Sequence, residues 1–523
     1  MSKNWWKHGV IYHIYPQSFY DTNGDGIGDL RGIIRQLDYL ERLGVDAIWI
    51  SPIYQSPLVD MGYDISDYRA INPMYGNMSD FKELLALAHI RGMKVIMDLV
   101  LNHTSDKHPW FVESRSSLLN PKRDWYIWEK PNDKGNRPNN WTTNFGQKAW
   151  TLDPTTGEYY CHSFFKEQPD LNWRNEDLKR EMFAVIRFWL DLGVDGFRLD
   201  VINYIFKSKK LKNNPFWQHF TNKGVHNRNH QRVYPFLKEF RALLDEYPNR
   251  TSVGEIYTAP PGDSELAASF VGNGKDMLHM AFDFSLIFTR WNAQKYEQVI
   301  NRYYDALPKN GQPCFVMSNH DLGRNLQRKF FMRHKEAKAK VLTMLLLTLR
   351  GTPFIYYGDE IGMENSVIKR KYIRDLYGKL FYPFYKGRDR SRTPMQWSSK
   401  PYAGFSTARP WLPVNGNYRK VNVEKAKAES GSLLNLHKKL IKLRRKHTAL
   451  HKGTICFESS DNQVLIFTRS HKEERIMVLL NFSRKPQVVQ LPEGLQLFSI
   501  SGEAHQQGLV ELRGFEGLMW EVM

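Results

Sequence analysis

The chain has 523 residues, which is long enough for a large core and for more than one domain. Its three cysteines, Cys161, Cys314 and Cys456, form no C-x-x-C pair, so we expect neither a disulfide framework nor a zinc site. No apolar run is long enough to span a membrane, and the first residues lack the apolar core of a signal peptide. These features favour a cytoplasmic protein without a membrane partner.

The net charge of +19 raises the question of an anionic partner. The basic residues are scattered along the chain, and no recognition-helix, RRM or zinc-finger pattern accompanies them. A run of charge is usually a solvated face of the protein. We therefore interpret the charge as basic surface and expect no nucleic-acid partner.

Helical and β-rich segments alternate along most of the chain. Helical periodicity is present over 30–43, from 79 to Gly92, and over 176–192, 235–246, 335–349 and 432–446. Alternation of this kind indicates a parallel sheet, and eight units are the number of a (β/α)8 TIM barrel in the α/β class. The eight predicted β segments are 9–19, 47–53, 94–100, 196–200, 251–256, 280–284, 313–321 and 353–360.

Two intervals are too long for simple connections, and the tail of the chain has a different pattern. Residues 104–175 are rich in Pro, Asn, Gly and Trp and predict a subdomain inserted after the third strand, while 361–430 form a second excursion after the eighth. We expect the barrel in two parts, 1–103 and 176–450. Residues 451–523 have short apolar runs near 464–468, 475–482, 486–491, 496–500 and 517–523, which predict an antiparallel C-terminal β-sandwich domain.

Charged side chains stand at the carboxyl ends of several predicted barrel strands, where catalytic residues of such barrels lie. On strand 196–200, Arg198 and Asp200 share one face, and the guanidinium should keep the acid ionised. Glu255 lies in an apolar segment that should raise its pKa, and Asp321 follows the seventh strand. A protonated acid and an ionised carboxylate are the pair that cleaves a glycosidic bond, although each acid alone also fits a structural ion pair.

Five motifs give the chain a family resemblance. They are DLVLNH at 98–103, GFRLD at 196–200, VGE at 253–255, SNHD at 318–321 and QPDLN at 168–172. The chain resembles glycoside hydrolase family 13, the α-amylase family, over essentially its whole length, and the last motif is typical of its oligo-1,6-glucosidase and neutral α-glucosidase branch. The resemblance implies a retaining hydrolase with Asp200 as nucleophile, Glu255 as acid/base and Asp321 as transition-state stabiliser.

The same resemblance implies a set of substrate-binding residues and exo-specificity. Asp60 would pair with Arg392, in the loop RDRSRTPMQW at 388–397, and close the pocket behind a terminal glucose. Tyr63 would stack on that glucose. The remaining residues that match substrate-binding positions are His103, Phe145, Phe164, Gln168, Arg198 and His320. Core packing is the alternative role for the three aromatic residues.

The loop 21–29 carries regularly spaced oxygen ligands, which hard cations prefer. A glycine stands at residue 32, where an EF-hand would carry its closing Glu, so an EF-hand is not expected. The resemblance implies a structural Ca²⁺ or Mg²⁺, with no organic cofactor, whereas an Asx-turn-rich loop without metal is the alternative. The ligands would be Asp21, Asn23, Asp25, the carbonyl of Ile27, and Asp29.

The substrate remains open among several possibilities. A valine after the proposed nucleophile, here Val201, is similar to enzymes that act on α-1,6 bonds, whereas the segment 204–250 resembles enzymes of α-1,4 preference. The segment 255–258 also departs from the form common in oligo-1,6-glucosidases. Arg390 and Lys207, with Lys209 and Lys210, could favour a phosphorylated sugar, so a trehalose-6-phosphate hydrolase is an alternative. A transglycosylating α-glucosidase or isomerase is another. A non-catalytic transporter heavy chain is a remote one, because it needs a membrane helix and this chain keeps all three carboxylates.

Overall fold

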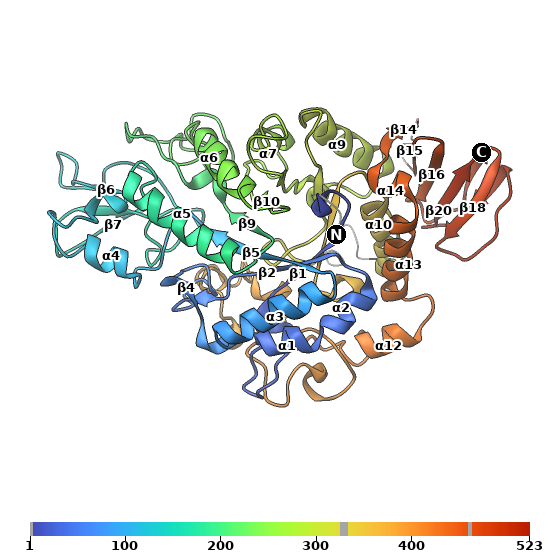
Figure 1. The fold of residues 1–523 in the computed structure, drawn as a ribbon, viewed down its shortest axis with the longest axis horizontal. Coiled ribbons are helices and arrows are strands. Elements are labelled where there is room, and N and C mark those ends of the chain that lie inside the picture. The colour runs from blue at the N-terminus through green and yellow to red at the C-terminus, as the bar shows by residue number, and fades with distance from the viewer. Residues whose placement is uncertain (1–3, 325–332, 459–462) are drawn as a thin grey trace.

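The computed structural model describes residues 4–324, 333–458 and 463–523 (Figure 1). Its centre is a parallel sheet in the order β11-β10-β9-β5-β2-β1-β13-β12. A parallel bridge between Asp283 and Phe315 joins the two end strands, so the sheet closes into the predicted (β/α)8 barrel. The strands are β1 (Ile11–Ile14), β2 (Ala47–Ile50), β5 (Lys94–Val100), β9 (Gly196–Asp200), β10 (Thr251–Gly254), β11 (Met280–Ala281), β12 (Cys314–Val316) and β13 (Thr352–Tyr356).

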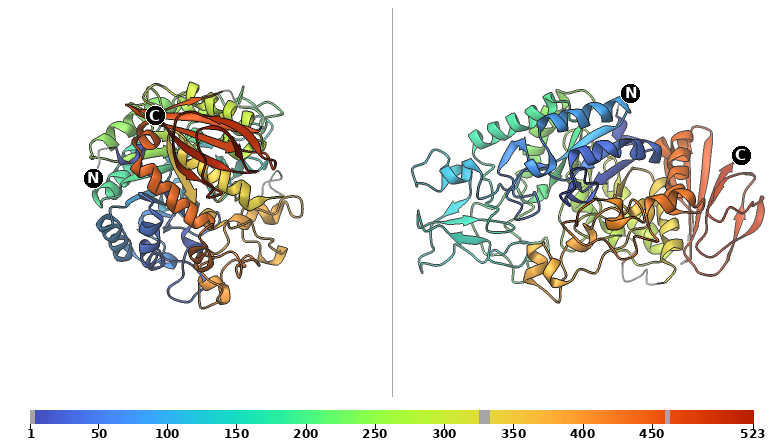
Figure 2. Two further views of the ribbon diagram at one scale, coloured as in Figure 1. Left: turned by 90° about the vertical axis from the view of Figure 1, so that its right-hand side faces the viewer. Right: turned by 90° about the horizontal axis from the view of Figure 1, so that it is seen from below.

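Amphipathic helices surround the barrel (Figures 1 and 2). In α5 (Glu176–Asp191), for example, Leu178, Met182 and Trp189 are buried at helical spacing, and the Asn175 side chain caps the first turn. The other helices of this layer are α1 (Leu30–Arg35), α2 (Leu37–Leu43), α3 (Met78–Ile90), α6 (Val233–Asp245), α7 (Ser264–Ser269), α8 (Ser285–Phe288), α9 (Ala293–Ala306), α10 (Lys335–Thr348) and α13 (Leu433–Lys446).

The segment predicted as one helix over 30–43 is two helices. At Gln36 the amide N–H donates to the carbonyl of Ile33 at 3.0 Å, three residues back, so the turn tightens and the axis breaks. Helix α2 then ends at Gly44, whose φ of 94° is the left-handed conformation expected of a C-terminal glycine.

The segment inserted after β5 has its own small sheet at one end of the molecule (Figure 1). Its three antiparallel strands are β6 (Trp128–Glu129), β8 (Tyr159–Cys161) and β7 (Trp150–Leu152), and α4 (Pro109–Ser114) precedes them. A hairpin of β3 (Tyr54–Gln55) and β4 (Asp67–Ile71) follows β2. The excursion after β13 contains the short helices α11 (Leu376–Leu380) and α12 (Val423–Ala428).

The C-terminal residues form two antiparallel sheets at the opposite end of the molecule (Figures 1 and 2). One buried apolar cluster, which includes Leu479, Leu491, Leu512 and Trp520, holds strands of both sheets together. No helix in the described ranges is long and apolar enough to cross a bilayer. The helix α14 (Thr448–Lys452) precedes β14 (Thr454–Phe457), β15 (Val464–His471), β16 (Glu474–Asn481), β17 (Gln487–Leu491), β18 (Gly494–Ser499), β19 (Gly508–Leu512) and β20 (Gly517–Val522).

The strand register brings the charged residues of the sequence motifs to one mouth of the barrel. Arg198 in β9 lies directly across from Asp98 in β5 on one side and from Val253 in β10 on the other. Below them the barrel interior is filled by apolar side chains, among them Ile96 and Phe354. Because all eight strands are parallel, the residues that follow them share the same end of the barrel.

Two buried arginines hold the end of α10 in place, one from the barrel helix α13 and one from the C-terminal sheet. The guanidinium of Arg444 in α13 donates to the carbonyls of Leu347, Leu349 and Gly351 at 2.5–3.0 Å, where α10 ends and β13 begins. Arg469 in β15 donates to the carbonyl of Gly453 at 2.9 Å and also to that of Thr348. These bonds satisfy carbonyls that a helix end leaves without partners.

We predict that Arg444→Met lowers the free energy of unfolding by about 3 kcal/mol, because three buried carbonyls lose their donor at once. The matched control is Arg445→Met in the same helix, since Arg445 makes a half-exposed ion pair with Asp46. That pair should contribute less than about 1 kcal/mol. Denaturant titration measures both values, and equal losses in the two variants would contradict the prediction.

Candidate active site

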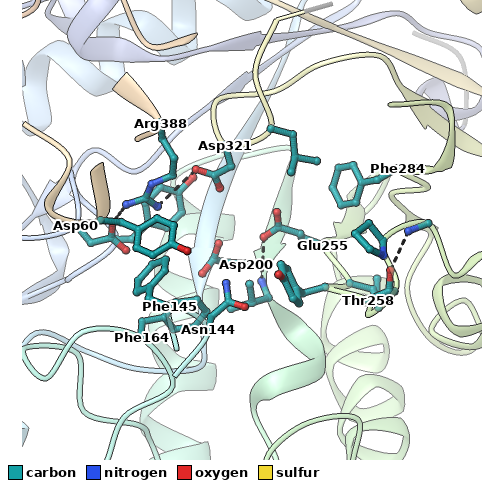
Figure 3. Close-up of a pocket in the computed structure, with 18 of the residues that line it drawn as sticks. Asp60, Asn144, Phe145, Phe164, Asp200, Glu255, Thr258, Phe284, Asp321 and Arg388 are labelled. Atoms are coloured by element: carbon teal, nitrogen blue, oxygen red, sulfur yellow. Dashed lines mark hydrogen bonds and ion pairs between the residues drawn. The ribbon is translucent and has the colours of Figure 1, made fainter. Parts of the chain in front are cut away.

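One buried guanidinium organises the mouth of the barrel. Arg198 is 1% exposed, and its Nη1 donates to Asp98 Oδ1 at 2.6 Å and to Asp200 Oδ1 at 2.7 Å. Its Nη2 donates to Glu255 Oε2 at 2.6 Å. Three carboxylates from three neighbouring strands therefore meet on a single cation, and the contact with Asp200 is the one that the sequence predicted. Figure 3 shows the side chains of Asp200 and Glu255 in the pocket.

The cluster contains three carboxyl groups but only one guanidinium. Burial, together with this excess of acid, raises the pKa values of the carboxyl groups. Burial raises the pKa of Asp98 to about 6 and also raises the pKa values of Asp200 and Glu255, while Arg198 opposes the shift in each case. One cation shared among three acids cannot hold all of them ionised. The prediction that Arg198 keeps the pKa of Asp200 low is therefore wrong, whereas the predicted rise at Glu255 is confirmed.

Asp321 has the opposite electrostatic environment. Arg392 Nη2 donates to Asp321 Oδ1 at 2.5 Å, and Arg392 Nε donates to the backbone carbonyl of His320 at 3.0 Å. Burial alone would raise the pKa of Asp321, but His320, Arg392 and Arg388 outweigh it and hold this pKa far below the usual range. Asp321 is therefore ionised at any physiological pH.

The pocket is closed at one end by an ion pair that differs from the expected one. Arg388, not Arg392, binds Asp60, with 2.6 Å between Arg388 Nη2 and Asp60 Oδ1. Arg392 is fully buried against His320 and Asp321 and cannot reach this end. The short 3₁₀ turn Asp389–Ser391 separates the two guanidinium groups, so the expected Asp60–Arg392 pair is wrong.

Asp375, which the sequence did not single out, holds Arg388 in place. Its Oδ2 accepts from the Arg388 amide at 2.8 Å, and its Oδ1 accepts from Arg388 Nη2 at 2.9 Å. Burial acts to raise the pKa of Asp375, but Arg388 lowers it to about 2. Asp389 in turn accepts from the amides of Arg374 and Asp375 at 2.6 and 2.9 Å.

The pocket itself contains most of the predicted site residues. Asp60, Tyr63, His103, Phe145, Phe164, Asp200, Glu255 and Asp321 line it. The other four predicted residues lie behind this lining. Gln168 Nε2 donates to Asp60 at 3.2 Å, and His320 Nε2 bonds to the hydroxyl of Tyr63 at 2.8 Å. Arg198 and Arg392 contact the acids described above. Gln168 Nε2 also bonds to His103 at 3.0 Å.

Several lining residues were not among the predicted site residues, although Arg388 and Val201 lie in or beside segments that the sequence analysis singled out. Many of them follow barrel strands directly, and position after a strand end is the only signal that could have found them. They are Asn144, Val201, Ile256, Tyr257, Thr258, Pro261, Gly262, Phe284, Phe288, Leu322, Tyr377, Tyr385 and Arg388.

Val201, directly after Asp200, has a strained backbone. Its φ and ψ are 35° and 46°, a left-handed conformation that is rare for a β-branched residue. The strained conformation points its amide N–H toward Glu255 Oε2, at 3.4 Å. Strain of this kind persists only where the surroundings enforce it, which is typical of functional sites.

The basic residues considered for phosphate binding do not line the pocket. Lys207 is buried, and its Nζ lies 2.7 Å from Asn102 Oδ1 and 2.9 Å from Asp170 Oδ2. Its charge is thus committed to an internal ion pair, and Arg390, Lys209 and Lys210 are also absent from the pocket lining.

The acidic loop 21–29 has the hydrogen bonds of Asx turns. Asp21 accepts from the amides of Asn23, Gly24 and Gly26 at 2.8–3.0 Å, and Asp25 accepts from the amide of Ile27 at 2.8 Å. Asp29 accepts from the amide of Thr22 at 2.8 Å. These bonds engage some of the carboxylate lone pairs and leave others, so the all-oxygen donor set remains compatible with a hard cation.

Two family models match the chain in succession. The model of the alpha amylase catalytic domain matches residues 13–453, and that of the maltogenic amylase C-terminal domain matches residues 455–519.

Curated and solved relatives span nearly the whole chain. A probable alpha-glucosidase of Rhizobium meliloti and an oligo-1,6-glucosidase of Parageobacillus thermoglucosidasius are each 41% identical, over 94% of this chain and 91% and 93% of their own lengths. The crystal structure of the alpha-glucosyl transfer enzyme XgtA superposes with a TM-score of 0.94, at 38% identity and full coverage of both chains. With the barrel and its cluster of acids, these matches show that the chain belongs to the α-amylase family, glycoside hydrolase family 13.

Proposed function

We propose that the chain is an exo-acting, retaining α-glucosidase that releases terminal glucose from short α-glucosides of the maltose or isomaltose type. The observation that carries this proposal is the position of Asp200 and Glu255 on one guanidinium, in a pocket that Asp60 and Arg388 close at one end. A short separation between the two acids is characteristic of retaining glycosidases, since inverting enzymes need room for a water molecule. The names of the relatives support the substrate class.

The proposed chemistry has two displacements. Asp200 attacks the anomeric carbon and forms a glucosyl ester, while Glu255 gives its proton to the departing glycosidic oxygen. Glu255 then takes a proton from water as the water attacks the same carbon and releases Asp200. Both N–H groups that reach Glu255 bond to its Oε2, so Oε1 is left to carry the proton.

The roles of the acids differ in how the electrostatics bear on them. Burial raises the pKa of Glu255, as a general acid requires, and it raises that of Asp200 as well, so the assignment of the proton to Glu255 and of the free carboxylate to Asp200 is part of the proposal. Asp321, whose low pKa keeps it ionised, would accept hydrogen bonds from two sugar hydroxyls and stabilise positive charge at the anomeric carbon. His103 and Tyr63 would contact the same glucose, with Phe145 and Phe164 against its ring faces.

Three alternatives to this function are glucosyl transfer, hydrolysis of a phosphorylated sugar and a non-catalytic role, and the structure supports them unequally. Glucosyl transfer is favoured by the likeness to an alpha-glucosyl transfer enzyme and would share the first displacement. A phosphorylated substrate finds no support in Lys207, whose charge is neutralised internally. A non-catalytic role is disfavoured, because Asp200, Glu255 and Asp321 all line one pocket.

We also propose that the loop 21–29 binds a structural Ca²⁺ or Mg²⁺, which would offset two of the three negative charges of its carboxylates. The holding residues would be Asp21, Asn23, Asp25, Ile27 through its carbonyl, and Asp29. The buried positions of Asp21 and Asp29 support a structural role rather than a catalytic one.

A cytoplasmic location of the protein is a further proposal, supported by the three free cysteines.

Asp200→Asn should reduce glucose release from maltose and isomaltose by on the order of 10⁴-fold with little change in thermal stability, because the amide cannot act as nucleophile. Asp200→Ala in the presence of azide should form β-glucosyl azide, since azide then attacks from the face that Asp200 occupies. Near-full activity of Asp200→Asn, or an azide product of α configuration, would contradict the nucleophile assignment.

Asp375→Asn should raise KM and the inhibition constant of glucose by about tenfold and change kcat less. Without the charge of Asp375, Arg388 Nη1, now 3.6 Å from Asp321 Oδ1, is drawn toward that acid and away from its sugar-facing position. The control is Asp80→Asn, a buried acid at the start of α3 that pairs with Arg31 far from the pocket. Similar kinetic constants for both variants would refute a positioning role for Asp375.

Removal of bound metal by a chelator should lower the thermal midpoint of the wild-type protein, and added Ca²⁺ or Mg²⁺ should restore it, because the cation screens the acids of the loop 21–29. In the Asp21→Asn variant the midpoint should no longer respond to either treatment. A wild-type midpoint that is insensitive to chelator and to both cations would favour the metal-free Asx-turn alternative.

A further inference from the structure

Most of the exposed aromatic side chains among the described residues lie in two loops. We call residues 207–223, after β9, the β9 loop, and residues 366–387, after β13, the β13 loop. Phe216 is 95% exposed, Phe220 80% and Phe384 98%. Single exposed apolar residues are common, but a gathering of large ones usually marks a binding surface. The exposed apolar residues considered below are Phe216, Trp217, Phe220, Leu380, Phe381 and Phe384.

The β9 loop buries its polar side chains and exposes its aromatic ones. Asn214 is buried, and its Nδ2 donates to Gln218 Oε1 at 2.9 Å. The buried Arg228 donates to the carbonyls of Gln218 and Thr221 at 2.7 and 2.8 Å. These bonds fix the backbone of the loop and leave its three aromatic side chains in solvent. Because apolar side chains normally occupy the interior, the reversed pattern indicates that the aromatic residues serve a partner.

The β13 loop has the same reversed pattern. Its single acid, Asp375, is buried at the base of the loop. Gly378 and Gly387 bring the two arms of the loop into contact, since a Cβ on Gly378 would lie 2.7 Å from Gly387 Cα. The tip between these arms carries the exposed Leu380 and Phe384. The base is thus fixed by polar and close backbone contacts, while the apolar tip projects from the molecule.

Both loops contact the same segment of the inserted subdomain. Trp141 Nε1 donates to the carbonyl of Lys212 in the β9 loop at 2.9 Å. The ring of Phe145 lies 4.6 Å from that of Tyr377 in the β13 loop, measured between centroids. Because β9 and β13 are parallel strands of one barrel, both loops leave its same end. The apolar tips therefore belong to one end of the barrel.

The exposed charges of the two loops are all positive. The β9 loop contains no Asp or Glu, and the single acid of the β13 loop is buried. The exposed basic residues of the β9 loop are Lys209, Lys210, Lys212 and Lys223. Those of the β13 loop are Lys369, Arg370, Lys371, Arg374, Lys379 and Lys386. Basic runs that are far apart in the sequence are thus brought to one end of the barrel, where they attract anions.

An anionic bilayer matches both the charge and the apolar tips. Lysine and arginine are attracted to anionic head groups, and protruding aromatic side chains gain from insertion at the boundary with the acyl chains. A second copy of this surface would repel the first, because both carry the same charge. Single-stranded nucleic acid binds in grooves whose aromatic rings stack on bases, whereas Phe216 and Phe384 are almost fully exposed and protrude.

We propose that the β9 loop and the β13 loop form a membrane-docking surface that binds bilayers containing anionic lipid. The basic residues contact lipid phosphates, and the six exposed apolar side chains enter the head-group region. The sequence expectation of no membrane partner rested on the lack of a spanning run, which peripheral binding does not need. The inference is independent of the proposed function, because none of the six side chains lines the active-site pocket.

Flotation with lipid vesicles tests the proposal. The wild-type protein should float with vesicles of phosphatidylglycerol and phosphatidylcholine in equal parts, and not with vesicles of phosphatidylcholine alone. The double variant Phe216→Ser with Phe220→Ser should lower the partition coefficient by about tenfold, because apolar area no longer leaves water, and Phe384→Ser should lower it as well. Lys209→Gln should lower it by about fivefold, the effect of one lysine near an anionic surface.

The matched controls are Leu509→Ser and Lys485→Gln. Both residues are exposed and belong to the C-terminal domain, at the end of the molecule opposite the inserted subdomain (Figure 1). These variants should float as the wild type does. All variants should keep the wild-type thermal midpoint, because the replaced side chains are exposed, so a loss of flotation reports lost binding rather than unfolding.

Tryptophan fluorescence tests insertion directly, because Trp217 is the one exposed tryptophan among the described residues. Brominated phosphatidylcholine quenches a tryptophan that reaches the acyl chains. On anionic vesicles that contain this lipid, the wild type should lose fluorescence, and Trp217→Phe should bind but lose markedly less. Equal quenching of the two proteins would show that the β9 loop does not insert.

Three further results would overturn the inference. The first is a wild-type protein that fails to float with the anionic vesicles. The second is equal flotation of the loop variants and the two controls. The third is binding to a single-stranded oligonucleotide of thymidines without binding to the vesicles, which would identify nucleic acid as the partner of the basic surface.

Discussion

The contact on which the site depends is the guanidinium of Arg198 among Asp98, Asp200 and Glu255. A buried arginine without partners would be too costly to keep charged, and three buried acids without a cation would not stay close together. The pairing solves both problems at once, but it leaves a surplus of negative charge. That surplus is useful, since a glycosidase needs one carboxyl group that holds a proton beside one that does not.

The barrel makes this contact possible through its strand register. Asp98 and Arg198 are direct neighbours across β5 and β9, and the main-chain positions of both are set by parallel pairing rather than by the charges. The loops then complete the pocket from distant parts of the chain. The inserted segment supplies Phe145 and Phe164, and the excursion after β13 supplies Arg388, so the rigid sheet carries the reacting groups and the loops carry the recognition.

Electrostatics divide the pocket into a charged half and an apolar half. Arg392 and Arg388 hold Asp321 ionised at the charged half, whereas burial dominates at Asp200 and Glu255. The left-handed backbone of Val201 lies between these groups, and it brings an amide toward Glu255 at the cost of local strain. The arrangement indicates that the fold stabilises a geometry that the local sequence alone disfavours.

Much of the architecture follows from short-range patterns, because hydrophobic periodicity reports which face of a segment is buried. The eight barrel strands stand at the predicted segments, and the helix over 176–192 is present as α5. The short strands β14 and β19 were missed, since their alternation is weak and half-exposed. The break at Gln36 was missed because no glycine or proline marks it.

Within the site, the sequence by itself determined the acids Asp200, Glu255 and Asp321, because motif and strand order place them at strand ends. Only the tertiary structure decided which arginine faces Asp60, that Asp375 holds Arg388, and that Lys207 is an internal ion-pair partner rather than a phosphate ligand. The reason is physical. A motif specifies residue types along the chain, but the direction of a long charged side chain, and the pKa values of acids that share one cation, depend on groups that folding brings together from distant positions.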